Sequence, residues 1–185
     1  YRAFYFVGIG GIGMSALARY FKVIGKQVSG YDKTPSPITD ALIQEGCGVD
    51  FVGSVSKLPK AYLNASETLV VYTPAVSDLH PQLEYFKENG FEVLKRSEAL
   101  GLITRFKKAL CVAGTHGKTT TSAMLAHALN ETQHKCSAFL GGISSNFNSN
   151  VVINGTSEWT VVEADEFDRS FLHLSPHSSI VTSMD

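Results

Sequence analysis

Apolar residues in the first part of the chain follow two spacings. Residues 3–7 (Ala-Phe-Tyr-Phe-Val) are apolar at every position, which is typical of a strand buried on both faces of a parallel sheet. After a glycine-rich turn, apolar residues recur at helical spacing until Gly25 ends the predicted helix: Met14, Leu17, Ala18, Phe21 and Ile24. A second strand is predicted over residues 27–31. The result is a strand–helix–strand unit of about 30 residues.

The same alternation continues toward the middle of the chain. Helices are predicted over residues 38–45, 82–89 and 98–104, and strands over residues 68–72 and 92–94. Strands that alternate with helices indicate an α/β fold, in which a doubly wound, Rossmann-like parallel sheet carries helices on both faces.

A second strand–turn–helix segment begins after the basic residues 105–108. Residues 109–113 read as a buried strand, which runs into another glycine-containing turn and a helix carrying Met124, Leu125 and Leu129. Beyond a Ser/Asn-rich stretch (144–150), strands are predicted over 159–162 and 179–182. We therefore expect two domains, 1–106 and 107–185, the second a partial P-loop α/β domain. Because the chain begins and ends close to a predicted strand, we expect it to be a piece of a longer protein.

Composition narrows the class of protein. Sixteen basic and seventeen acidic residues among 185 give a net charge of -1, which does not favour a nucleic-acid-binding surface. No apolar run approaches the roughly 18 residues of a membrane span, and the N-terminus lacks the pattern of a signal peptide. Three widely spaced cysteines without a CxxC pair predict reduced, packed thiols and a cytoplasmic protein.

The first turn, residues 8–13, fits the pattern G-x-G-x-x-G. The first glycine permits the tight turn, the second lets backbone approach a diphosphate, and the third lets helix and strand pack closely. Asp32 lies 19 residues beyond Gly13, where a carboxylate can bond a ribose hydroxyl. The turn predicts a nucleotide-diphosphate site, for which NAD is the usual ligand; a tight turn with a solvated Asp32 is the alternative. The candidate binding residues are Gly10, Gly11, Ile12, Gly13, Ser15 and Asp32.

The second turn carries a stronger signal. Gly117-Lys118-Thr119 follows a buried strand and opens a helix, as a P-loop requires. The lysine supplies a positive charge for the outer phosphates of ATP, and the Thr119 hydroxyl can ligate Mg²⁺. The loop is a shortened variant, because its first glycine is Gly114 whereas the eight-residue pattern would place it at Val112. The predicted ATP-binding residues are Gly114, Thr115, His116, Gly117, Lys118, Thr119 and Thr120.

A P-loop also needs an acid at the end of a neighbouring strand to hold the metal. Residues 159–162 are such a strand, and four carboxylates follow within six residues: Glu163, Asp165, Glu166 and Asp168. Glu163 is nearest the strand, so Thr119 and Glu163 are the predicted metal ligands. The other three acids are assigned either to supporting roles or to a solvated turn.

Several single residues keep two interpretations. His116 contacts substrate or phosphate, or it only shapes the loop; with Lys118 it is a candidate catalytic residue. Ser15 bonds a phosphate or belongs to the start of the helix. His173 and His177 are four residues apart, but Pro176 argues against a helical zinc site.

Three blocks of sequence together resemble the Mur ligase family, and the resemblance extends over essentially all 185 residues. The blocks are residues 8–15, residues 114–121 and Glu163-Ala164-Asp165-Glu166. The continuation over residues 171–174 (Phe-Leu-His-Leu) favours the members that add alanine over those that add a murein tripeptide, which share both turns.

The resemblance implies a function in peptidoglycan synthesis. It implies that the first domain binds UDP-N-acetylmuramate, with Gly10 to Gly13 and Ser15 on the diphosphate and Asp32 near the nucleoside. The second domain would bind ATP and Mg²⁺, and a third domain would help to bind L-alanine. In the implied reaction the muramate carboxylate attacks the γ-phosphate of ATP, and the amine of alanine then attacks the acyl phosphate.

Two departures from the family pattern affect these expectations. Phe167 stands where many alanine-adding members have a small polar residue. The family continues, beyond the strand ending at Thr182, with an Asp-His pair that supplies a second metal ligand, and the chain stops before it. We therefore expect this piece to be inactive alone, so a non-catalytic module that binds the UDP-sugar is an alternative. An NAD-dependent oxidoreductase is the third reading, disfavoured by the P-loop.

Overall fold

The computed structural model describes residues 1–166 and 169–185 with their side chains, while the side chains of Phe167 and Asp168 lie outside that description. The chain divides into two compact units, residues 1–99 and 100–185. Helix α4 (Arg96–Phe106) begins in the first unit and ends in the second, so the division falls inside this helix, before the boundary after residue 106 that the sequence predicted. Among the described residues no helix has the length and apolar character needed to cross a membrane.

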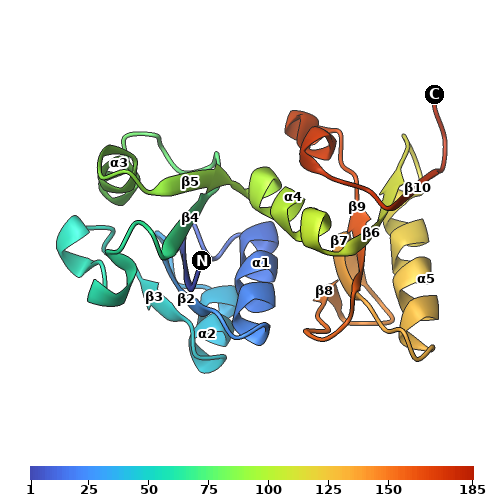
Figure 1. Ribbon diagram of the computed structural model, residues 1–185, viewed down its shortest axis with the longest axis horizontal. Coiled ribbons are helices and arrows are strands. Elements are labelled where there is room, and N and C mark those ends of the chain that lie inside the picture. The colour runs from blue at the N-terminus through green and yellow to red at the C-terminus, as the bar shows by residue number, and fades with distance from the viewer. The chain divides into compact units, whose positions relative to one another are not determined.

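The first unit is built on a five-stranded sheet with the order β3-β2-β1-β4-β5, whose neighbours all pair in parallel (Figure 1). Its elements are β1 (Ala3–Val7), α1 (Ile12–Val23), β2 (Gln27–Tyr31), α2 (Pro37–Gln44), β3 (Gly48–Asp50), β4 (Thr68–Tyr72), α3 (Pro81–Glu88) and β5 (Glu92–Lys95). Two short 3₁₀ helices, Val55–Lys57 and Lys60–Tyr62, lie between β3 and β4.

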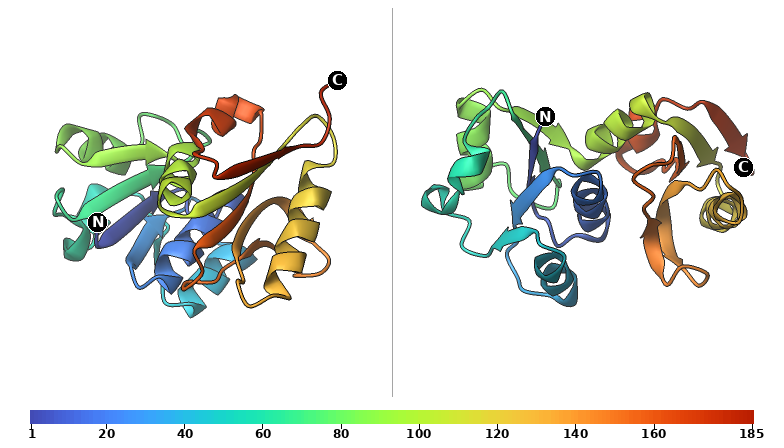
Figure 2. Two further views of the ribbon diagram at one scale, coloured as in Figure 1. Left: turned by 45° about the vertical axis from the view of Figure 1, so that its right-hand side comes forward. Right: turned by 60° about the horizontal axis from the view of Figure 1, so that its bottom comes forward.

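Strand β1 is buried at all five positions because helices cover both faces of the sheet. Phe4 stacks on Phe21 of α1, with ring centroids 3.8 Å apart. On the opposite face Tyr5 packs against Phe86 of α3, with centroids 5.2 Å apart. Figure 2 shows α1 and α3 on opposite sides of this sheet, as the predicted doubly wound fold requires.

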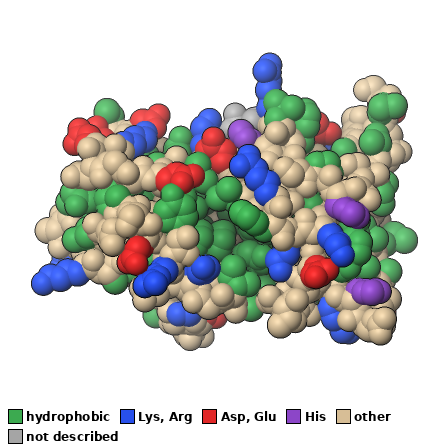
Figure 3. All heavy atoms as spheres, in the orientation of Figure 1, with side chains coloured by type: hydrophobic (Ala, Val, Ile, Leu, Met, Phe, Trp, Pro, Cys, Tyr) green, Lys and Arg blue, Asp and Glu red, His purple; other side chains and the backbone are tan. Residues whose placement is uncertain are grey.

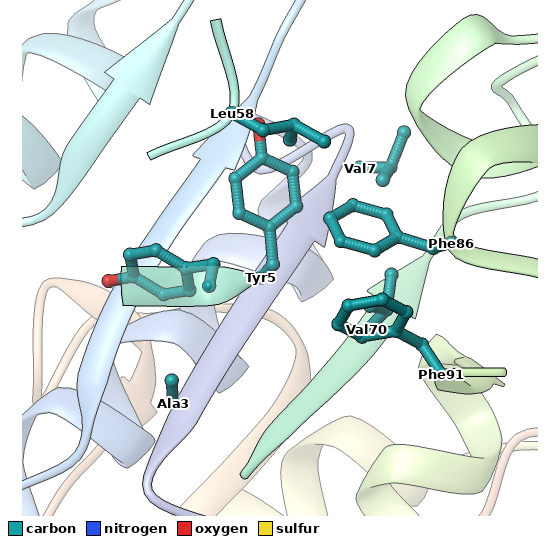
Figure 4. Close-up of a cluster of buried hydrophobic side chains, with 8 residues drawn as sticks. Ala3, Tyr5, Val7, Leu58, Val70, Phe86 and Phe91 are labelled. Atoms are coloured by element: carbon teal, nitrogen blue, oxygen red, sulfur yellow. The ribbon is translucent and has the colours of Figure 1, made fainter. Parts of the chain in front are cut away.

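The core on the α3 face joins residues far apart in the sequence. Figure 4 shows the side chains of Tyr5, Val70 and Phe86 gathered on one side of the sheet, with Leu58 from the connection before β4. The Tyr5 hydroxyl donates a hydrogen bond of 3.0 Å to Oε1 of Gln82, which is also buried. Burial raises the pKa of Tyr5 above its ordinary value, so the phenol stays neutral.

The second unit contains another five-stranded sheet, ordered β10-β6-β9-β7-β8. Its elements are β6 (Lys108–Ala113), α5 (Lys118–Asn130), β7 (Ser137–Ser144), β8 (Ser149–Val152), β9 (Trp159–Glu163), the 3₁₀ segment Phe167–His173 and β10 (Ser178–Val181). Strands β10, β6, β9 and β7 pair in parallel, whereas β8 pairs antiparallel with β7. Helix α5 packs on one face through Ala126, against Cys136, Ala138 and Val161.

The α/β class is confirmed, and three strands were missed. Strand β3 has three residues, too few for a periodic pattern. Strands β7 and β8 form a pair that turns back through the Ser/Asn-rich stretch. That stretch reads locally as a loop, because serine and asparagine favour turns.

The charges on the face shown in Figure 3 are of both signs and interspersed.

Candidate functional site

The first candidate site lies at the carboxyl edge of the first sheet. The glycine turn follows β1, Asp32 follows β2 and Thr73 follows β4, so three parallel strands deliver them to the same edge. A cavity of about 640 Å³ opens there, lined by Gly8, Gly10, Gly11, Tyr31, Asp32, Lys33, Thr34, Ser36, Thr73, Ala75, Val76, Ser77 and His80. Crevices at the carboxyl ends of parallel strands, where the strand order reverses, are the usual ligand sites of such sheets.

Asp32 contacts the turn directly. Its Oδ2 accepts a hydrogen bond of 2.7 Å from the backbone N–H of Gly10. A Cβ atom at Gly10 would lie 2.8 Å from that oxygen and 2.9 Å from Cγ2 of Thr39, so a side chain larger than hydrogen does not fit. Asp32 therefore lines the cavity beside the turn, and its predicted contact with a ribose hydroxyl stays a prediction.

Gly13 has a different neighbour from the one expected. We predicted that it permits close packing of helix on strand. A Cβ atom there would lie 2.9 Å from Cδ and 3.1 Å from Nη1 of Arg96. The space beside Gly13 is thus occupied by an arginine side chain from the start of α4, and the predicted close packing of helix on strand stays a prediction.

Ser15 and Ile12, both at the start of α1, differ in burial. Ser15 is buried, and its hydroxyl donates a 3.0 Å hydrogen bond to the carbonyl of Ile12. This hydrogen bond agrees with the helix-start interpretation of Ser15, and phosphate binding by Ser15 stays a prediction. Ile12 is 61% exposed at the first position of α1, so its side chain does not pack in the core.

Sequence reasoning missed the aromatic wall of the cavity. Tyr31 and His80 lie with ring centroids 4.4 Å apart, and both line the cavity. Nδ1 of His80 is buried without a hydrogen-bond partner. Burial lowers the pKa of His80 below its usual 6.5, against an opposing effect of Asp50. Tyr31 could have been suspected as the last residue of a predicted strand, but nothing in the sequence places His80 beside it.

The second candidate site is the phosphate loop between β6 and α5. Gly114 and Gly117 have φ angles of 127° and 82°, in the region that favours glycine, and Gly117 is the N-cap of α5. A cavity of about 300 Å³ is lined by Thr115, His116, Gly117, Lys118, Thr119, Thr120 and Glu163. The fold thus brings the predicted loop residues together with the predicted acid.

Lys118 lies across the loop. Its Nζ donates hydrogen bonds to the carbonyl of Gly114, at 2.7 Å, and to Oε2 of Glu166, at 3.0 Å. The lysine side chain is only 13% exposed. Hydrogen bonding to this ammonium lowers the pKa of Glu166, which is an exposed carboxylate. From the sequence, Glu166 was expected either to support the site or to belong to a solvated turn.

Thr119 and Glu163 form a hydrogen-bonded pair of oxygen groups beside the loop. The Thr119 hydroxyl donates a 2.9 Å hydrogen bond to Oε1 of Glu163, and the Gly141 N–H donates to Oε2 at 2.7 Å. Glu163 ends β9, which pairs in parallel with β6, so the predicted acid at the end of the neighbouring strand is confirmed. A hydroxyl and a carboxylate beside a phosphate loop suit Mg²⁺, which prefers one or two protein oxygens together with phosphates and waters.

Residues after β10 brace the loop, and sequence reasoning missed them. Thr115 N–H donates to the carbonyl of Ser183 at 3.1 Å, and His116 N–H donates to Ser183 Oγ at 3.1 Å. The His116 ring, 81% exposed, lies 3.1 Å from Oδ2 of Asp185. His116 therefore has a loop contact of its own, and its predicted substrate contact stays a prediction. The parallel pairing of β10 beside β6 brings these residues there, and only the topology reveals it.

Other candidates do not form sites. His177 packs edge-on against Trp159, and the carbonyl of His173 lies near Gly101, so the two histidines serve separate contacts. Within residues 1–166 and 169–185 no group of three or more His, Cys, Asp or Glu side chains is placed to hold a metal. Predictions for Phe167 and Asp168 lie outside the described side chains.

The three cysteines are free and buried. Burial raises the pKa of both Cys111 and Cys136 to about 11, consistent with packed, unreactive thiols.

Similar proteins support this picture. The family described as "Mur ligase family, catalytic domain" matches residues 3–108. A UDP-N-acetylmuramate–L-alanine ligase from Porphyromonas gingivalis is 58% identical over 98% of the chain, and one from Flavobacterium psychrophilum is 57% identical over 98%. The chain spans about 40% of the length of these relatives.

Solved structures agree with the fold. The UDP-N-acetylmuramate–alanine ligase from Thermotoga maritima superposes with a TM-score of 0.81 at 32% identity, covering 98% of this chain and 41% of that one. A UDP-N-acetylmuramate:L-alanyl-γ-D-glutamyl-meso-diaminopimelate ligase from Neisseria meningitides gives a TM-score of 0.83 at 25% identity, covering 100% and 61%. From its glycine turn, its phosphate loop and these similarities, the chain belongs to the Mur ligase family.

Proposed function

We propose that these residues are part of an enzyme of peptidoglycan synthesis that joins L-alanine to the carboxylate of UDP-N-acetylmuramate, with ATP converted to ADP and phosphate. The observation that carries the proposal is the arrangement of Lys118, Thr119 and Glu163 around one phosphate loop. A Rossmann-like unit that binds nucleotide diphosphates has no need of such a loop, whereas a ligase that activates a carboxylate does.

The reaction needs positive charge where phosphate is transferred. The muramate carboxylate attacks the γ-phosphorus of ATP, the bond to the β-phosphate oxygen breaks, and an acyl phosphate forms. The amine of alanine then attacks the acyl carbon, loses a proton, and phosphate leaves. Lys118 is suited to the developing charge because its ammonium is already held at the loop by the Gly114 carbonyl.

Thr119 and Glu163 would hold Mg²⁺, which supplies charge neutralisation on the transferred phosphate. The Gly141 N–H orients the Glu163 carboxylate toward Thr119 before any ligand binds. The protein contribution is thus a preformed pair of oxygens next to the lysine.

The first unit would bind the sugar nucleotide. Its cavity has the volume of a small-ligand site, and Asp32 stands beside the turn at the ribose position. The 57–58% identity to alanine-adding relatives favours alanine as the added group over the tripeptide of the relative that is 25% identical. Each acceptor amine gives a separate, measurable outcome.

Phosphate release by the complete protein tests the proposal. We expect release that requires UDP-N-acetylmuramate, ATP, Mg²⁺ and L-alanine together, and we expect none from residues 1–185 alone. Glu163→Gln should raise the Mg²⁺ concentration for half-maximal rate by about tenfold or more, because it removes a charged ligand. The matched control Glu67→Gln, on an exposed ion pair of the first unit, should leave it unchanged.

Titration calorimetry on the 185-residue chain separates the alternatives. UDP-N-acetylmuramate should bind, and NAD should not. Binding of NAD without binding of the UDP-sugar would reject the ligase reading. Alanine-dependent turnover by the 185 residues alone would reject the expectation that this piece is inactive. Release that depends on the tripeptide instead of alanine would reassign the amine substrate.

A further inference from the structure

Arg96 is a charged side chain that the predicted site did not include. It is the first residue of α4 and directly follows β5, so it stands at the same carboxyl edge of the sheet as the glycine turn. A Cβ atom on Gly13 would lie 2.9 Å from its Cδ, 3.1 Å from its Nη1 and 3.4 Å from its Nε. The guanidinium therefore rests on the first turn of α1.

In the described part of the chain no acid pairs with this guanidinium. The other two arginines of the first unit have partners: Arg2 lies 3.3 Å from Glu67 and Arg19 lies 2.8 Å from Glu45. The first turn of α1 holds no acidic residue, and its N-cap Gly11 has no side chain to accept from the free N–H groups. Two positive groups, the helix start and the arginine, thus lie side by side, while the nearby carboxylates bond backbone N–H groups instead of the guanidinium: Asp32 accepts from Gly10 and Glu98 accepts from Lys95. An anion between them would relieve this repulsion.

The strand order decides which part of a nucleotide reaches Arg96. Asp32 follows β2, on one side of β1, whereas Arg96 follows β5, on the other side beyond β4. The cavity wall contains Asp32 and Tyr31 but not Arg96. A nucleotide with its ribose at Asp32 and its diphosphate over the glycine turn therefore has its distal end at Arg96.

We propose that Arg96 binds the phosphate of the sugar nucleotide that is distal to the ribose, and so holds the sugar end in place. This inference rests on the proposed sugar-nucleotide site and specifies the orientation of the nucleotide in it. A planar guanidinium can donate two parallel hydrogen bonds to one phosphate, which fixes orientation as well as affinity. Gly13 is required because any side chain there would displace Arg96 from the turn.

Calorimetry with UDP and UMP tests the assignment in the 185-residue chain. In Arg96→Gln, affinity for UDP should fall about 10- to 100-fold, the range for losing hydrogen bonds to a charged group. Affinity for UMP, which lacks the distal phosphate, should change less than about twofold. Arg96→Lys keeps the charge but not the planar donor pair, and should give an intermediate loss for UDP.

The controls separate this inference from the proposed function. Arg2→Gln, which removes an exposed arginine of the same unit, should leave both affinities unchanged. Without ligand, Arg96→Gln should unfold at the same or a slightly higher temperature, because it removes an uncompensated charge. Equal UDP affinity in Arg96→Gln and the unchanged chain, or equal losses for UDP and UMP, would overturn the role of Arg96 alone. Failure of the unchanged chain to bind UDP or UDP-N-acetylmuramate would overturn the sugar-nucleotide site itself.

Discussion

Lys118 donates hydrogen bonds to the Gly114 and Thr115 carbonyls of its own loop and to Glu166, so the loop already orders its cation. An ATP phosphate would replace the Glu166 carboxylate as acceptor, while the bond to Gly114 can persist. The lysine therefore needs little rearrangement to bind phosphate, which is the arrangement that electrostatic catalysis favours.

Replacing this lysine should affect turnover more than folding. In the complete protein, Lys118→Ala should lower the rate of ATP-dependent ligation by about 100-fold or more, because the transferred phosphate loses its protein charge. Lys87→Ala, which removes an exposed ion pair with Asp78, should change the rate little. A rate for Lys118→Ala within a few-fold of the unchanged enzyme would contradict the proposed role.

His80 predicts a pH dependence of stability. Its folded-state pKa is lowered mainly by burial, while in the unfolded chain the ring titrates near 6.5. Above pH 6.5 both states are neutral and the stability is fully present. As the pH falls below 6.5 the unfolded state takes up the proton first, so the free energy of unfolding decreases until the pH passes the folded pKa.

Urea unfolding followed by circular dichroism between pH 7.5 and 5.5 measures this effect. The unchanged chain should lose more stability over this range than His80→Gln, and His127→Gln, at an exposed position of α5, should behave like the unchanged chain. Identical pH slopes for the unchanged chain and His80→Gln would contradict the prediction.

At the scale of elements, the strand–turn–helix segments could be read from the sequence because their signals are local. Buried parallel strands give apolar runs, and α1 shows helical spacing from Met14 to Phe21. Strand β4 has the predicted bounds, residues 68–72. The pair β7 and β8 was missed because its hydrogen bonds join residues on the two sides of a Ser/Asn-rich turn. Such pairing produces no periodic pattern of apolar residues in that part of the sequence.

The missed pairing also hid part of the proposed metal site. Gly141 lies in β7, and its N–H orients Glu163. No sequence spacing links these two residues, since their contact arises only when β7 pairs with β9.

Phe86 contributes a large aromatic side chain to the core on the α3 face of the first sheet. Phe86 is fully buried against Tyr5 and Phe91. Phe86→Ala should destabilise the first unit by about 3–5 kcal/mol, from lost apolar burial and the cavity left behind. Leu79→Ala, at a position that is 76% exposed, should cost little.

The chain carries its own probes for this test. All seven tyrosines lie within residues 1–99, and the single tryptophan, Trp159, lies in the second unit. Phe86→Ala should lower the denaturant midpoint of the tyrosine near-ultraviolet signal more than that of Trp159 fluorescence. Equal shifts of both signals would show that the two units unfold as one.

At the scale of the whole molecule, the two sites lie in separate compact units. Hydrogen exchange of the 185-residue chain should therefore show two independent footprints. UDP-N-acetylmuramate should protect backbone amides of residues 8–15, and ATP with Mg²⁺ should protect those of residues 114–121. Protection of the phosphate loop by the UDP-sugar alone would contradict this assignment of ligands to units.

The sequence by itself determined the α/β class, the two glycine turns and the family, because each is written in contiguous residues whose spacing reflects local backbone geometry. Only the tertiary structure decided which distant groups meet: Arg96 on Gly13, His80 on Tyr31, and Gly141 with Glu163. Strand order determines those meetings, and strand order arises from packing the whole sheet rather than from any one segment. The phosphate loop could therefore be identified from six consecutive residues. The other side chains of both sites could be identified only from the fold.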